Sequence, residues 1–213
     1  MEEKKNWFSE HLVSLILGFF TLAATCTSGW FIYNQHTKDA MTDLRIEQMK
    51  QENKEKAEIT ERNVAVIYGD LWELLIRLNA DRVYIIQPHP QTNYYYLSTF
   101  FEVSSKGVTK ATEIIKNVPM SEVPIFSKEI STNNWIFYNN MDEQVKDERV
   151  KSIIKLAGAK QVAIQHLVNI NGKWNGNLVA SRLTNNPFDE KVLQREMKNT
   201  ATMVQYILPS IDE

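Results

Sequence analysis

The sequence predicts an α+β protein in which two N-terminal helices precede a central antiparallel sheet of five to six strands flanked by helices. Three observations predict this class. Residues 12–33 form one long uncharged stretch, residues 64–78 carry apolar side chains at helical spacing directly before a β-type run, and Asn171-Gly172 separates two further β-type runs. Since strands joined as hairpins run antiparallel, the sheet is expected to be antiparallel.

The first predicted helix covers residues 12–33, which contain no Asp, Glu, Lys, Arg or His. A helix of that length rises 1.5 Å per residue and spans the roughly 30 Å hydrocarbon core of a bilayer. Aromatic side chains stand near its ends, where they anchor at the headgroup regions: Trp7, Trp30 and Tyr33. We therefore predict a single-pass N-terminal transmembrane helix after a short polar leader at residues 1–11.

Small and hydroxyl-bearing residues recur on one side of this predicted helix at steps of four and three: Ser14, Gly18, Thr21, Thr25 and Ser28. In lipid, helices associate through close backbone approach and hydroxyl hydrogen bonds rather than through the hydrophobic effect. The stripe therefore predicts a helix–helix association face and a homo-oligomer. An isolated membrane helix also tolerates these hydroxyls, because they can bond back to the preceding turn.

The membrane segment is expected to stay as an uncleaved anchor, because the leader is not basic and the apolar run is longer than that of a signal peptide. Lysines and arginines flank both ends, so the positive-inside rule leaves both orientations open. Residues 34–62 are rich in helix formers and contain no Pro or Gly. They predict a juxtamembrane helix or stalk. A charged disordered linker is the alternative, since a helix without a packed face is marginal in water.

The composition excludes several functions. A net charge of -2 and a pI near 6.1 do not indicate the basic surface that nucleic-acid binding requires. Cys26 is the only cysteine and lies in the predicted span, so the soluble part has no disulfide framework and no thiolate metal site. His89 and His166 have no acidic or cysteine partner at a catalytic or metal-binding spacing. We expect neither enzymatic activity nor a bound metal or cofactor.

The soluble domain, residues 63–213, begins with an amphipathic helix. Its apolar positions recur at helical spacing: Val64, Ile67, Leu71, Leu74, Leu75 and Leu78. Two β-type runs follow at 82–87 and 93–104 and predict a hairpin. The second run is dense in Tyr and Phe, which suit a half-buried pleated surface. Such a cluster can line a ligand pocket, although packing is the more common role.

A connector over the sheet is expected at 105–134, because prolines interrupt any long element and only 124–130 favours a short helix. A short apolar run predicts a strand at 135–138. A charged helix is then expected at 143–156, ended by Gly158. Its predicted inward-facing side chains are Val150, Ile153, Ile154 and Leu156.

Asn171-Gly172 is a strong hairpin signal and predicts two strands at 161–170 and 174–184. The last helix is expected to open with Pro187 in its first turn. Its apolar stripe comprises Leu193, Met197, Ala201, Val204 and Leu208. We predict that the first and last helices pack together on one face of the sheet, because only these helices and the hairpin carry enough apolar surface for a core.

The order of these elements resembles a GAF/PAS-like domain over roughly residues 63–208. The hairpin AIQHLVNINGKWNGNLVASRL, with Gly176 entering its final strand, carries the resemblance, together with PFDEKVLQREMKNTATMVQYIL, which is similar to the GAF family's Phe-x-x-x-x-Leu terminal helix. The resemblance implies a sensory or protein-interaction fold. The Gly-rich turn before the middle helix is absent and the domain has no cysteine to attach a bilin, so nucleotide or chromophore binding is not implied.

The layout of the whole chain resembles the holins of the T-even phages. That resemblance implies a phage protein that oligomerises through its span, permeabilises the inner (cytoplasmic) membrane of a bacterial host and times host cell lysis. Its C-terminal domain would be a periplasmic sensor for an antiholin-like protein. The periplasmic cysteine pair of the T-even type is missing here. The alternative is a membrane-anchored GAF-like sensor or interaction protein without its own output domain, with a cytoplasmic orientation still open.

Overall fold

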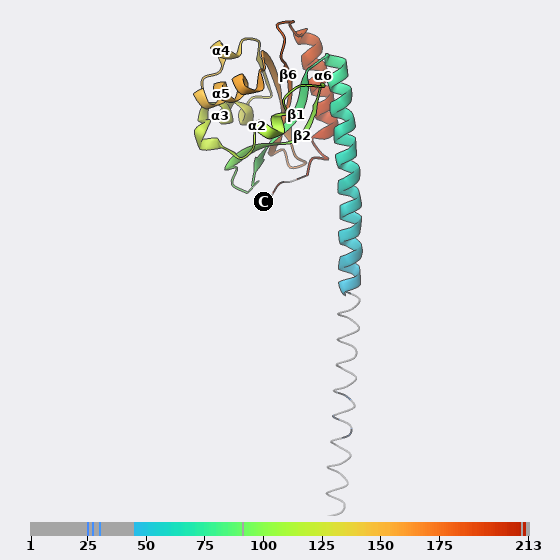
Figure 1. Cartoon of the computed structure of the whole chain (residues 1–213). Coiled ribbons are helices and arrows are strands. Elements are labelled where there is room, and N and C mark those ends of the chain that lie inside the picture. The colour runs from blue at the N-terminus through green and yellow to red at the C-terminus, as the bar shows by residue number, and fades with distance from the viewer. Residues whose placement is uncertain are drawn as a thin grey trace, which may run out of the picture. The chain divides into compact units, whose positions relative to one another are not determined.

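The computed structural model describes residues 25, 27, 30, 45–90, 92–209 and 211 (Figure 1). The chain divides into two compact units, Met1–Glu58 and Ile59–Glu213. In the first unit, residues 45–58 are helical. The predicted transmembrane segment lies outside the described residues except for Thr25, Thr27 and Trp30. Among the residues that are described, no helix has the length and hydropathy needed to cross a membrane.

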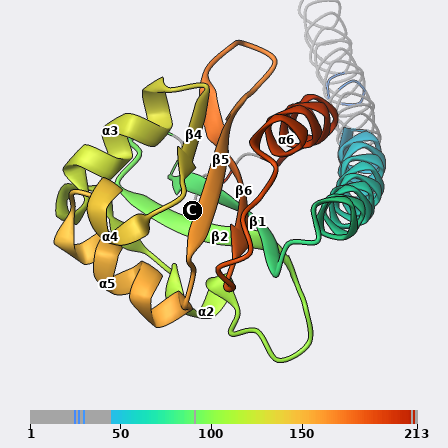
Figure 2. The ribbon, with the colours of Figure 1, turned by 90° about the horizontal axis from the view of Figure 1, so that it is seen from above.

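The second unit contains a six-stranded sheet with the order β3-β2-β1-β6-β5-β4, and every neighbouring pair is antiparallel (Figure 2). The strands are β1 (Arg82–His89), β2 (Tyr96–Ser104), β3 (Val118–Pro119), β4 (Trp135–Tyr138), β5 (Gln161–Val168) and β6 (Trp174–Arg182). The α+β class and the antiparallel sheet are therefore confirmed. The short edge strand β3 was not predicted.

One face of the sheet packs against two helices, residues 59–78 and α6 (Glu190–Val204) (Figure 2). The predicted apolar stripes of both helices join strand residues such as Val83 and Ile85 in one core. This arrangement confirms that the first and last helices pack on the same face. Because side chains alternate along a strand, Tyr84 and Ile86 point to the opposite face.

That opposite face carries a second core, so the expectation that only the two long helices and the hairpin supply enough apolar surface for a core is wrong. Val150 lies in this core and Ile153 and Ile154 pack against it, which confirms their predicted inward positions. The second core is covered by short helices and their connections: α2 (Ala111–Ile114), a 3-10 turn (Met120–Glu122), α3 (Pro124–Thr132), α4 (Met141–Gln144) and α5 (Glu148–Ala157) (Figure 2). Residues Ile130, Val145 and Val150 are buried in it. Strand β1 is buried at every position because both faces of the sheet are covered.

The helix predicted at 143–156 is two helices, α4 and α5. Asp147 has an extended backbone at the N-cap position of α5, and its carboxylate accepts a hydrogen bond from the Phe126 N–H at 2.6 Å. This contact with α3 interrupts the charged run that the sequence pattern treated as continuous. The expected inward position of Leu156 is wrong, since that side chain is 71% exposed. Gly158 does end α5 in the left-handed conformation, as predicted.

The start of α6 also differs from the prediction. Asp189 is the N-cap residue, and its side chain accepts a hydrogen bond from the Val192 N–H. Pro187 lies two residues before this cap and outside the helix, and its carbonyl accepts a hydrogen bond from the Arg182 guanidinium. The capping carboxylate therefore decides where the helix begins.

Asp70, on helix 59–78, is half-buried, and among the described atoms its Oδ2 has no hydrogen-bond partner. Burial, followed by the nearby charge of Glu73, raises the pKa of this carboxyl. An acid whose pKa is higher in the folded than in the unfolded state favours folding only while it is protonated. The ionised group therefore destabilises the domain once the pH exceeds the unfolded pKa of about 3.9.

Replacing Asp70 with Asn is accordingly expected to raise the free energy of unfolding at pH 7. The gain should shrink as the pH falls and disappear below about pH 3.9, where the wild-type carboxyl is neutral in both states. Urea unfolding of both proteins at several pH values measures this difference. If Asp70→Asn raised the free energy of unfolding equally at low and neutral pH, the stabilisation would not come from removing the ionised Asp70 carboxylate.

Candidate ligand-binding site

An apolar cavity lies within the second core, between the sheet and its cover of short helices. Strand residues Tyr84, Ile164 and Val179 line the cavity from the sheet. Phe126 of α3 and Ile154 of α5 line it from the cover. The cavity volume is about 50 Å³. The free space is thus walled almost entirely by aliphatic and aromatic side chains from elements far apart in the sequence.

Two phenols contribute polar groups to the lining. Burial raises the pKa of Tyr84 to about 12. The Tyr138 hydroxyl donates to the Glu129 carboxylate at 2.7 Å. Burial, and secondly this carboxylate, raises the pKa of Tyr138. Both phenols therefore stay protonated at neutral pH, and the lining carries no charge. A charged ligand would lose its hydration here without a partner, so the cavity favours a neutral apolar group.

The volume of the cavity limits what it can hold. Pockets for drug-sized ligands usually measure roughly 300–1,000 Å³, whereas this one has about 50 Å³. A single water needs roughly 10–15 Å³ on this scale, so a few light atoms fit. A large chromophore does not fit the cavity in this conformation. The domain also contains no cysteine, since Cys26 is the only one in the chain.

A more polar hollow of about 590 Å³ adjoins the cavity. Met141, Ile154 and Ala159 line both spaces. The hollow otherwise has mainly amide and lysine side chains, among them Asn140 and Lys160. The shared residues place the hollow directly beside the apolar cavity.

The two strand histidines lie outside the cavity lining. His89 Nε2 is 2.9 Å from the Ser98 hydroxyl oxygen, and His166 Nδ1 is 3.1 Å from the Ile130 carbonyl oxygen. Both rings also stack on aromatic neighbours, Tyr96 and Trp174 respectively. Within the described residues, no group of three or more His, Cys, Asp and Glu side chains could hold a metal ion.

The residues predicted to form an association face are mostly outside the described part of the chain. Ser14, Gly18, Thr21 and Ser28 lie there, as do Trp7 and Tyr33 of the predicted interface anchors. Thr25 and Trp30 are described and helical, and the Trp30 side chain is 68% exposed. The association face and the anchors therefore stay predictions.

Sequence reasoning missed the cavity. None of the aromatic residues at 94–96, 100 and 101 lines it. Phe101 packs in the core on the other face, which agrees with the packing role that was preferred for this cluster. Each lining residue has the sequence signal of an ordinary core position. The two phenols Tyr84 and Tyr138, each within an apolar strand, are the signals in the sequence that could have pointed to a different environment on that face.

No protein-family model and no curated protein matches this chain. Several solved structures match it by fold. The GAF domain of Thermosynechococcus elongatus PixJ, in its blue-light absorbing form, superimposes with a TM-score of 0.56 at 12% identity, covering 69% of this chain and 87% of that one. The domain has a GAF-like fold. At this identity the likeness shows the fold alone.

Two further matches are domains of a phytochrome and of a bacteriophytochrome. The phycocyanobilin-bound GAF domain of a cyanobacterial phytochrome gives a TM-score of 0.54 at 16% identity, covering 70% of this chain and 91% of that one. The chromophore-binding domain of a bacteriophytochrome from R. palustris gives a TM-score of 0.53 at 12% identity. The match covers 72% of this chain and 60% of that one. The GAF-like fold is thus one that photoreceptor domains share.

Proposed function

We propose that this chain is a sensory or regulatory protein whose GAF-like domain binds a small neutral apolar molecule in the cavity beneath α3 and α5. The observation that carries the proposal is the uncharged apolar lining formed by the central strands and the short helices. A ligand there would contact both layers. Occupancy would therefore change the packing of α5 on the sheet, which is the event a sensor must convert into a signal.

The likeness to photoreceptor domains supports this sensor proposal over the holin expected from the layout. No match and no described residue supports hole formation. In the proposal, the predicted span at residues 12–33 serves as a single-pass anchor in the inner (cytoplasmic) membrane of a bacterium. Membrane potential after overexpression separates the two functions, because a holin would collapse it and an anchored sensor would leave it intact.

Val179, on the central strand β6, is the position at which to test ligand binding. Xenon suits the wild-type cavity, because apolar cavities stay dry and accept such gases. Binding should appear as a rise in melting temperature under xenon pressure. Val179→Ala should cost about 2 kcal/mol of stability. The enlarged cavity should then accept benzene, which would restore part of the loss.

Val179→Phe is the matched variant that fills the cavity from the same position. Its melting temperature is expected to be unaffected by xenon or benzene. Circular dichroism of the three purified full-length proteins, with and without each gas or ligand, makes the comparison. Equal shifts for all three would mean that the probes bind elsewhere, and no shift for the wild type and Val179→Ala would overturn the ligand-binding proposal.

A further inference from the structure

The outer edge of β4 carries backbone groups that the sheet of one copy does not use. β4 ends the strand order, and within the described part of the chain only β5 pairs with it (Figure 2). The His166 N–H donates to the Asn134 carbonyl at 3.1 Å, so position 134 directs its backbone groups towards β5. These groups alternate in direction along an antiparallel strand. The N–H and C=O groups of Trp135 and Phe137 therefore point away from the sheet.

This edge lacks the features that usually keep a free strand edge from pairing, such as charged side chains, prolines and bulges. Residues 133–140, NNWIFYNN, contain no charged residue and no proline. The register between β4 and β5 is regular over its whole length, so no bulge turns the edge away. The edge strand at the other end of the sheet, β3, has two residues and one of them is Pro119. Only the β4 edge is thus suited to accept a further strand.

The spacing of the free groups fits a second copy of the same strand. Two strands related by a two-fold axis perpendicular to the sheet run antiparallel. With the axis at Ile136, Trp135 of each copy lies opposite Phe137 of the other. Each of these two pairs exchanges two hydrogen bonds. The four bonds use all the outward N–H and C=O groups of Trp135 and Phe137 in both copies.

Neighbouring registers do not satisfy the same groups. A shift by one residue would set outward groups against groups already bonded to β5. A shift by two would need the N–H of Asn133 or of Asn139. Those groups already donate within one copy, to the Glu129 carbonyl at 3.0 Å and to the Gln144 side chain at 2.9 Å. The register centred on Ile136 is therefore the one that the edge favours.

The side chains also suit pairing of the strand with itself. Trp135 and Phe137 lie on the face of the two long helices and are half-buried. Each would stand beside the other's counterpart, and cross-strand aromatic pairs stabilise a sheet. Ile136 would meet its own counterpart on the opposite face. A charged strand would set like charges against each other in this arrangement, whereas residues 133–140 carry none.

We propose that a second copy of this chain pairs through β4, so that the two sheets join as one continuous antiparallel sheet. A standard interface has roughly ten hydrogen bonds, so this contact is a weak one in dilute solution. Copies that share a membrane through the span predicted at residues 12–33 would meet at a far higher effective concentration. The contact uses neither the long helices nor ligand binding in the cavity.

A cysteine at the two-fold axis tests the proposal in the full chain. In a Cys26→Ser background, Ile136→Cys would place two thiols in a non-hydrogen-bonded pair, with Cα atoms about 4.5 Å apart, which is within the range of a disulfide. The thiol oxidant diamide, added to intact expressing cells, should link these copies at least tenfold more efficiently than Ser152→Cys copies. Ser152 is an exposed position on α5.

Two further variants report the register. Trp135→Cys and Phe137→Cys, co-expressed with different tags, should link mainly to each other, because positions 135 and 137 lie opposite each other across the axis. Each should link much less to its own kind, since identical positions are then two residues out of register. Equal linking in all combinations would contradict pairing of β4 in this register.

Trp135→Pro is the variant that blocks the edge. It removes an outward N–H that β5 does not use, so one copy should keep its sheet. Combined with Ile136→Cys, it should lower linking at least tenfold, whereas Trp135→Val, which keeps the N–H, should retain most of it. Circular dichroism checks that both variants fold, and the three cysteine variants decide the question without the proline. Linking of Ile136→Cys no better than that of Ser152→Cys, or unchanged by Trp135→Pro in a folded protein, would overturn the proposal.

Discussion

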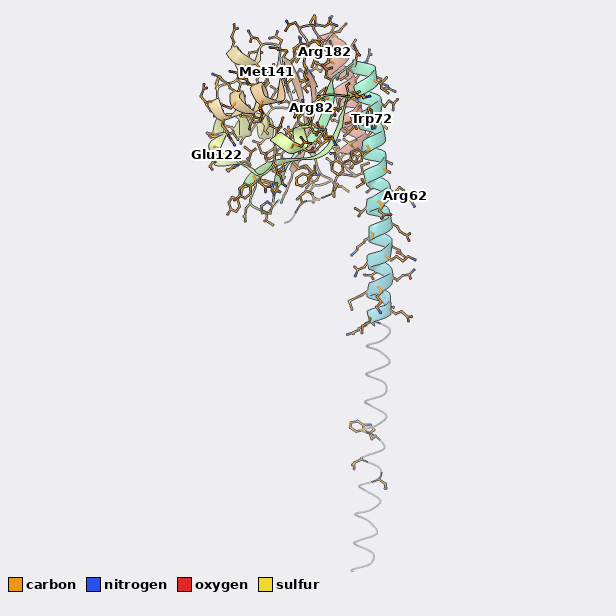
Figure 3. All side chains as sticks on the ribbon, in the orientation of Figure 1. Arg62, Trp72, Arg82, Glu122, Met141 and Arg182 are labelled. Atoms are coloured by element: carbon orange, nitrogen blue, oxygen red, sulfur yellow. The ribbon has the colours of Figure 1, made fainter. Side chains whose placement is uncertain are left out.

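Replacing Glu102 with Gln is expected to lower the free energy of unfolding by about 3–5 kcal/mol, the usual cost of breaking one side of a buried ion pair. The side chains of Glu102 and Arg82 are 3% and 1% exposed, with Oε1 and Nε 3.6 Å apart. Without the carboxylate, Arg82 would keep a buried charge, and its one remaining hydrogen bond within the described part of the chain is to the Ala157 carbonyl, 3.1 Å from Nη2. Figure 3 labels Arg82 within the domain.

The same carboxylate holds the start of α2. It accepts hydrogen bonds from the Ala111 and Thr112 N–H groups, at 2.7 and 2.9 Å, and from the Thr112 hydroxyl at 2.9 Å. A glutamine in its place keeps one oxygen that can accept some of these hydrogen bonds, but its NH2 group would face the remaining donors. Glu113→Gln, an exposed change in the same helix, is the matched control and should alter stability by less than about 0.5 kcal/mol.

Urea unfolding followed by tryptophan fluorescence measures both variants. Combining Glu102→Gln with Arg82→Met should recover part of the loss, because the buried charge is removed with its partner. If Glu102→Gln changed the free energy of unfolding as little as Glu113→Gln does, the ion pair and the α2 contacts would not contribute to stability as the geometry indicates.

Arg182→Met is expected to lower the free energy of unfolding by about 4 kcal/mol, because charge-assisted hydrogen bonds contribute about 1.5–3 kcal/mol each and the buried Leu78 carbonyl would lose its donor. The Arg182 guanidinium donates to the carbonyls of Leu78 and Asn79, at 2.7 and 3.1 Å, and to those of Asn186 and Pro187, at 3.0 and 2.9 Å. It also stacks over the Phe188 ring at 3.9 Å. One side chain thus joins the end of helix 59–78 to the loop before α6.

Arg182→Lys is the informative comparison. Lysine keeps the charge but lacks the planar, forked guanidinium that reaches two pairs of carbonyls. We therefore expect the free energy of unfolding to fall by about half as much as in Arg182→Met. Hydrogen exchange should show faster opening of the first turn of α6 in both variants. Equal stability of the Lys variant and the wild type would mean that charge, and not the forked geometry, is what this position supplies.

The sequence predicted those parts of the fold that local patterns decide. The strand at Trp135–Tyr138 was located to the residue, because a short apolar run bounded by polar residues leaves little choice. The Asn171-Gly172 hairpin was also confirmed, with Gly172 in the left-handed region at φ 71°. The Asn169 side chain accepts hydrogen bonds from Asn171 and Lys173 N–H and shapes a longer turn than the dipeptide alone suggests.

Features that depend on distant contacts were not predictable in this way. The break between α4 and α5 depends on a hydrogen bond from Phe126 to Asp147, which are 21 residues apart. The pairing of Val118 and Pro119 with β2 is too short to leave a periodic pattern. The cavity arises from an imperfect fit between apolar residues that each look like ordinary core positions, so its existence cannot be read from any one segment.

The position of β1 at the centre of the sheet bears on how the chain folds as it is synthesised. β1 can pair with β2 soon after both leave the ribosome, but its other edge must wait for β6, which begins about ninety residues later at Trp174. Until then the β1–β2 hairpin exposes an apolar face and an unpaired strand edge, the features that promote aggregation. A truncated chain that ends before β6 should therefore require chaperones to remain dispersed.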